Sequence, residues 1–156
     1  MQHVYLEILK KKYNYHQLYL AFYKNYKNKI YVRELNYEPL DLLALAFKLD
    51  RLGITEDSLI IADSAEPRLI DDLKHSGINI EPVKKGTIES GIIRMQDYQI
   101  IVDESSNNIT KEFNNYVYLN KASKLYIDNW NHIIDAIRYN VIYNLDNPNK
   151  GKYSIY

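Results

Sequence analysis

The sequence of 156 residues contains no cysteine, so disulfides, thiolate zinc sites and cysteine nucleophiles are excluded. It contains no apolar run near the ~20 residues that a membrane-spanning helix needs, and no signal-peptide segment at its N-terminus. The phosphate-binding pattern GxxxxGK[ST] is also missing, which excludes an ATP-driven motor within this sequence. We therefore expect a cytosolic protein, without contact to a membrane, whose chemistry uses other residue types.

The sequence also lacks an excess of charge of either sign, since it has 20 basic and 20 acidic residues. This argues against binding to nucleic acid through a global positive field, although local basic patches such as Lys84 and Lys85 are present. Its length and its apolar content of 46% suit one domain with a proper core. We expect a single domain over 1–156, with a strand meander (1–37), an α/β core (38–145) and a tail (146–156).

The order of the expected elements changes after Pro39. Aromatic and β-branched residues predict three strands before it, at 3–9, 17–24 and 29–35. Helical periodicity and alternating short apolar runs follow, with Gly53 and Gly77 placed where helices should end. They predict helices at 40–53, 66–77, 87–98, from 107 and at 128–145, strands at 58–62, 78–83 and 99–103, and a short hairpin within 116–128.

This order favours an α/β fold with a mixed central sheet and helices on both faces. An antiparallel meander that is followed by α/β units is typical of the ribonuclease H-like fold. That fold is a common host for two-metal cleavage of phosphodiesters.

Asp63 directly follows the apolar run "SLIIA" (58–62), which reads as a strand covered on both faces. The carboxyl ends of strands in open α/β sheets face the functional crevice, so a carboxylate there can serve as a metal ligand. An equally good interpretation is that Asp63 caps the helix that starts near residue 66.

Asp135 lies in the last predicted helix, three residues after His132. The two side chains share one face with Arg138 and Tyr139, which is distinct from the apolar stripe containing Ile134. Two carboxylates that meet across a sheet and a helix can hold Mg²⁺ or Mn²⁺ and activate water for phosphoryl transfer. From spacing alone other acids could serve as well, namely Asp71, Asp72, Asp103 and Glu104.

Three segments resemble the C-terminal nuclease domain of phage terminase large subunits. They contain "ADSAEP" (62–67), "SGIIRMQDYQIIVDES" (90–105) and "NHIIDAIRY" (131–139), and the resemblance covers roughly 30–145. It implies a ribonuclease H-like fold and a metal-dependent endonuclease that cuts concatemeric double-stranded DNA during genome packaging in the bacterial host cell. It further implies, as partners, an ATPase motor, a small terminase subunit and the portal.

Carried over by motif, the resemblance makes Asp63 and Asp135 metal ligands for Mg²⁺ or Mn²⁺, in a site that holds two ions in the family. It places His132 beside the catalytic site, and Lys84 and Lys85 in a turn near the DNA backbone. The family's first-strand element, an Asp between glycines, is missing here, and Glu7 is the only acid before Glu34 that could replace it. The alternatives are therefore an active endonuclease, a degenerate module that binds DNA or a packaging partner, and another ribonuclease H-like enzyme such as a junction resolvase.

Overall fold

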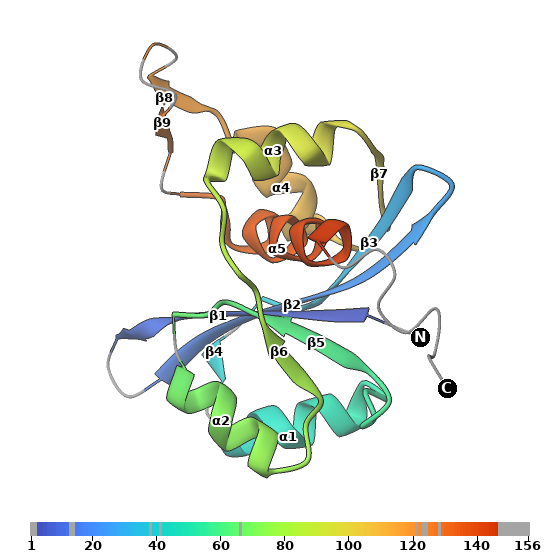
Figure 1. Cartoon of the computed structure of the whole chain (residues 1–156), viewed down its shortest axis with the longest axis vertical. Helices are drawn as coiled ribbons and strands as arrows, with labels where there is room; N and C mark the ends of the chain where they lie inside the picture. Colours follow the sequence, from blue (N-terminus) through green and yellow to red (C-terminus); the bar gives the residue numbers. More distant parts are fainter. Residues whose placement is uncertain are drawn as a thin grey trace, which may run out of the picture.

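A mixed β-sheet lies between two layers of helices (Figure 1). The computed structural model describes residues 3–12, 15–37, 39–40, 42–65, 67–120, 122, 125–127 and 129–146. Helices α1 (Leu42–Arg51) and α2 (Pro67–His75) cover one face of the sheet. The other face is covered by α3 (Ile88–Gln96), α4 (Asn107–Asn115) and α5 (His132–Asp146).

The sheet is built on the predicted antiparallel meander of β1 (His3–Lys12), β2 (Tyr15–Tyr26) and β3 (Lys29–Asn36). Lys27 and Asn28 form the turn between β2 and β3 with positive φ angles of 48° and 60°, as a tight hairpin turn requires. The two-residue strand β4 (Pro39–Leu40), which the sequence analysis did not predict, pairs with β2.

Three parallel strands extend this meander on its two sides. β5 (Leu59–Ala62) pairs with β1, β6 (Ile80–Pro82) pairs with β5, and β7 (Gln99–Val102) pairs with β3. The strand order is β6-β5-β1-β2-β3-β7. The predicted mixed sheet of a ribonuclease H-like fold is confirmed.

Strand β5 is covered on both faces, as its continuous apolar sequence predicts. All four of its side chains are buried. Leu59 and Ile61 join the core under α3, α4 and α5, while Ile60 and Ala62 join the core under α1 and α2. The strand that leads to Asp63 is therefore fixed by both cores.

The helices begin and end largely where the sequence places their signals. Pro67 is the first residue of α2, and Gly53 and Gly77 follow α1 and α2 with φ angles of 68° and 86°. Thr87 caps α3 by accepting a hydrogen bond from the Ser90 amide at 3.1 Å. In the described part of the chain, none of the helices has the length and apolar character needed to cross a bilayer.

The predicted hairpin is present as β8 (Tyr118–Asn120) and β9 (Leu125–Tyr126), which project from the helical layer (Figure 1). The last helix begins at His132 rather than near 128. Every residue from 133 to 142 is buried, so Asp135 and Arg138 are covered as fully as the apolar stripe of the helix. The domain limits stay a prediction, and 147–156 of the expected tail lie outside the described residues.

Candidate metal centre

Asp63 lies at the carboxyl end of β5, and only 6% of it is exposed. Its Oδ1 accepts a hydrogen bond from the Ala65 amide at 2.9 Å and lies 2.5 Å from Nζ of Lys85. The Tyr139 hydroxyl donates to Oδ2 at 3.4 Å. Because Ala65 precedes α2, the carboxylate closes the turn between β5 and α2 and does not cap the helix through this bond.

Asp135 lies in the first turn of α5 and is 7% exposed. Nε and Nη2 of Arg138 donate to its Oδ1 at 3.0 Å and 2.8 Å. Burial raises the pKa of Asp135, while the guanidinium of Arg138 lowers it in part and the negative charge of Asp63 raises it further. The structure thus brings the two predicted carboxylates within electrostatic reach of each other, from a strand end and a helix.

The guanidinium that holds Asp135 occupies a tight space between α5 and α3. Arg138 is 2% exposed, and its Cζ lies 4.6 Å from the centroid of the Tyr139 ring. On α3, a Cβ atom added at Gly91 would stand 2.6 Å from both Cγ and Cδ of Arg138. Gly91, which interrupts an otherwise good helical sequence, therefore leaves the volume that the arginine stem fills.

Gly91→Ala is expected to lower the free energy of unfolding and to displace Arg138. Alanine would favour an α-helix by up to about 1 kcal/mol. Overpacking typically costs about 1–3 kcal/mol, and here the obstacle is the buried stem of a side chain rather than its free end. Urea unfolding should show a lower free energy of unfolding for Gly91→Ala. For Ser90→Ala, on the exposed side of α3, the free energy of unfolding should stay within about 0.5 kcal/mol of the wild type. A more stable Gly91→Ala protein would contradict this account.

Of the other predicted residues, His132 begins α5 and its positive charge lowers the pKa of Asp135, so it lies beside the carboxylates. Lys85 contacts Asp63 directly, and Lys84 is exposed next to it. The alternative acids Asp71, Asp72, Asp103 and Glu104 are all exposed, unlike Asp63 and Asp135.

The register of the sheet bears on Glu7. Leu6 of β1 pairs with Ala62 of the parallel strand β5. Glu7 directly follows Leu6 and Asp63 directly follows Ala62, so the two acids occupy equivalent positions in the register. The role of Glu7 as a further ligand stays a prediction.

Glu112 was not predicted from the sequence, and it is completely buried on α4. Its Oε2 accepts hydrogen bonds from the amides of Ile133 and Ile134 at 2.8 Å and 3.0 Å, and its Oε1 accepts one from the Tyr37 hydroxyl at 2.8 Å. A carboxylate from another helix thus caps α5 and fixes the turn that carries Asp135. The available signal was the position of Glu112 three residues after Ile109, on the apolar face of its helix.

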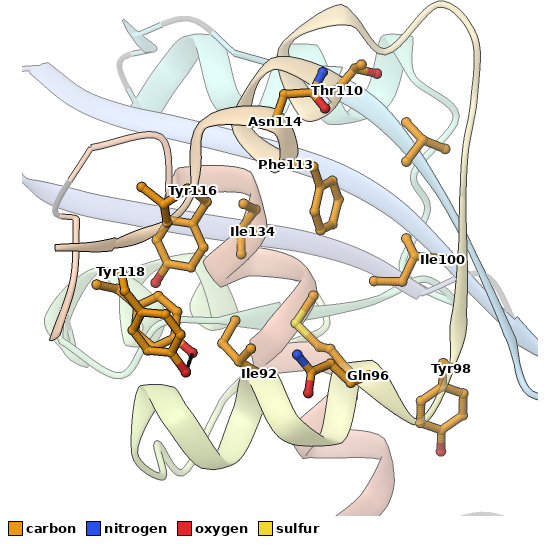
Figure 2. Close-up of a pocket in the computed structure, with 14 residues that line it drawn as sticks. Ile92, Gln96, Tyr98, Ile100, Thr110, Phe113, Asn114, Tyr116, Tyr118 and Ile134 are labelled. Carbon is orange, nitrogen blue, oxygen red and sulfur yellow. Dashed lines mark hydrogen bonds between the residues drawn. The ribbon is translucent and has the colours of Figure 1, made fainter. Parts of the chain in front are cut away.

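The largest pocket described, of about 930 Å³, is separate from these charged residues (Figure 2). It lies between α3, α4, β7 and the β8–β9 hairpin, and Phe113, Ile100 and Ile134 point into it. Tyr116, Tyr118 and Tyr126 stack at one side. Its described lining contains no acid, lysine, arginine or histidine, so the chemistry suggested by the carboxylates lies elsewhere.

The donor set at Asp63 and Asp135 fits a hard divalent cation. Both are buried carboxylates on rigid elements, and ions such as Mg²⁺ and Mn²⁺ prefer oxygen ligands of this kind. Within the described residues, however, no group of three or more acids, histidines or cysteines gathers to form a complete set of protein ligands. The structure therefore shows two donors, and water or a further residue would have to complete the coordination.

Strand order, helical layers and paired acids together define a nuclease-like member of the ribonuclease H-like fold class. Comparison with solved structures agrees. The chain resembles the nuclease domain of g2p, the large terminase of bacteriophage SPP1, which was solved with bound Mn. The two are 31% identical with a TM-score of 0.73, and the match covers 93% of this chain and 86% of that one. The chain belongs to the family of phage large terminase nuclease domains.

Further comparisons support the fold and define the extent of the match. The terminase large subunit of Bacillus phage SPP1 is 39% identical over an alignment of 128 residues, and the match covers 75% of this chain but only 30% of that relative. The nuclease domain of the P22 large terminase, at 11% identity, has a TM-score of 0.66 over 92% of this chain and 81% of that one. No model of a known protein family matches the sequence.

Proposed function

We propose that this domain is a divalent-metal-dependent endonuclease that cuts concatemeric double-stranded DNA during phage genome packaging. The observation that carries the proposal is a pair of buried carboxylates, Asp63 at the end of β5 and Asp135 on α5, near enough for the charge of Asp63 to raise the pKa of Asp135. The likeness to a nuclease domain solved with bound Mn supports it. A bound divalent metal would supply an activated water and stabilise the charge that develops on the phosphodiester.

The residues have distinct roles in this proposal. Asp63 and Asp135 would hold the metal, with Glu7 as a further ligand from β1. Arg138 orients the Asp135 carboxylate, and His132 would contact the phosphate or orient water beside it. Lys84 and Lys85 would contact the DNA backbone.

In this proposal the domain works with an ATPase motor, a small terminase subunit and the portal, in the cytoplasm of the bacterial host. The similarity to a terminase large subunit, of which this chain spans 30%, supports these partners. The motor would be supplied by sequence that has no counterpart here, since the chain has no GxxxxGK[ST] motif.

Incubation of the purified chain with supercoiled plasmid tests the proposal. We expect nicked and linear products with Mn²⁺ or Mg²⁺, and none after removal of the metal with EDTA. Asp63→Asn should be inactive because it removes a ligand charge, whereas Asp72→Asn, the same change at an exposed acid, should be active.

The same assay distinguishes the degenerate module from the enzyme. A wild-type chain that binds DNA but leaves plasmid intact over a wide range of metal concentrations would show that cleavage has been lost. Cleavage that persists in Asp63→Asn would place the catalytic site elsewhere.

A further inference from the structure

Lys85 forms a direct link between the candidate metal centre and a basic cleft. Its Nζ lies 2.5 Å from Oδ1 of Asp63 and 5.6 Å from the centroid of the Tyr139 ring. The side chain of Lys85 is 38% exposed, whereas that of Asp63 is 8% exposed. One end of the ion pair is therefore held by the strand, while the other sits on a long, solvent-accessible stem that can move.

A divalent cation and the Lys85 ammonium cannot both occupy this position on Asp63. A Mg²⁺ ion bound to a carboxylate lies about 2.0–2.1 Å from its oxygen, and Nζ of Lys85 stands 2.5 Å from the same oxygen. Two cations at one carboxylate oxygen would also repel each other in a poorly solvated site. Metal binding at Oδ1 therefore requires that Lys85 leave.

The place to which Lys85 can move is defined by the other residues of the cleft. A hollow of about 260 Å³ is lined by Lys84, Lys85, Gly86, Ser90, Arg94 and Ile142. Three of these residues are cationic, and the hollow extends along α3 from the turn before the helix to Arg94 in its last turn. Its chemistry suits an anionic group with several oxygen acceptors, such as a backbone phosphate of DNA.

We propose that Lys85 is an exchangeable counter-ion that neutralises Asp63 without metal and transfers to a DNA phosphate in the Lys84–Arg94 cleft when a divalent cation binds Oδ1 of Asp63. This inference rests on the proposed function and adds a regulation to it. Metal binding and DNA binding then reinforce each other, because each ligand favours the same position of Lys85.

Calorimetric titration with Mn²⁺ of the wild type, Lys85→Gln and Lys84→Gln gives the first test. Lys85→Gln should bind Mn²⁺ about tenfold more tightly than wild type, a change within the usual range of coupling between sites. Lys84→Gln removes the same charge from the adjacent position and should change the affinity by no more than about twofold. Lys85→Gln binding no more tightly than Lys84→Gln would overturn the inference.

The second test measures the affinity for a short fluorescent DNA duplex by anisotropy, in EDTA and in Ca²⁺. Lys84→Gln should weaken binding in both conditions. Lys85→Gln should weaken it about tenfold in Ca²⁺ but by less than about twofold in EDTA, where Lys85 is held by Asp63. Equal losses in both conditions would overturn the inference while leaving the nuclease proposal intact. Absence of Mn²⁺ binding in all three proteins would overturn both.

Discussion

Asp135→Asn is expected to reduce metal-dependent DNA cleavage by at least about a hundredfold, because the metal that Asp135 would hold supplies several kcal/mol of charge stabilisation. Asparagine has nearly the same shape and keeps one oxygen as an acceptor for Arg138. It cannot supply the negative charge that a divalent cation needs, and it leaves the buried guanidinium of Arg138 without its counter-charge. The measurement is the initial rate of plasmid nicking in Mn²⁺.

Loss of folding must be separated from loss of the metal ligand in this experiment. Asp71→Asn, at an exposed position of α2, is the matched control and should cleave at the wild-type rate. Circular dichroism should show that Asp135→Asn keeps its secondary structure at the assay temperature. A folded Asp135→Asn protein with an undiminished rate would remove Asp135 from the catalytic site.

Glu112→Ala is expected to lower the free energy of unfolding by about 3–5 kcal/mol, because each buried polar group left without its acceptor costs about 1–3 kcal/mol. The substitution leaves the amides of Ile133 and Ile134 and the Tyr37 hydroxyl without their acceptor, and it opens a cavity beside α5. Urea unfolding followed by circular dichroism gives this difference. Because the first turn of α5 carries Asp135, Mn²⁺ affinity should fall as well.

Glu112→Gln is the control that keeps the shape and one acceptor oxygen, and it should retain most of the stability. The pKa of Glu112 is raised in the folded chain, mainly because burial disfavours the charged form. Between the ordinary glutamate pKa and this higher value the folded chain holds more protons than the unfolded chain. The free energy of unfolding of the wild type therefore falls as the pH rises through that window.

Glu112→Gln cannot titrate, so its stability relative to the wild type should increase as the pH rises through the same window. Stability curves of the two proteins that run parallel across this range would show that the Glu112 carboxylate is not desolvated. Such parallel curves would also contradict the account in which the buried Glu112 carboxylate caps α5.

Local sequence patterns predicted much of the fold because the signals agree with tertiary contacts. Apolar runs marked β5, and Gly53 and Gly77 marked the ends of two helices with positive φ angles. The end of β5 also placed Asp63 at the correct edge of the sheet. The two-residue strand β4 was missed because so short a segment has no periodicity of its own.

The electrostatic surroundings of the carboxylates could not be predicted from local patterns. The contacts of Asp63 with Tyr139 and of Glu112 with Ile133 join residues that are far apart in the sequence. The burial of the face of α5 that carries Asp135 and Arg138 could not be predicted, because periodicity reports the polarity of side chains and not whether they are covered. Arg138 and Asp135 satisfy each other, so a polar strip can be buried as completely as an apolar one.

Because β5 is buried on both faces, hydrophobic burial alone does not determine its register with β1. In a strand that alternates, a slip by one residue exposes apolar groups to water, but Leu59–Ala62 would present apolar groups to both cores after such a slip. Asp63 supplies a further constraint, because its contacts with Lys85 and Tyr139 reach residues outside the β5–α2 turn and would be lost if the strand slipped. The carboxylate that is suited to hold a metal thus also helps to set the register of β5, and with it the helical layer toward which each side chain of the strand points.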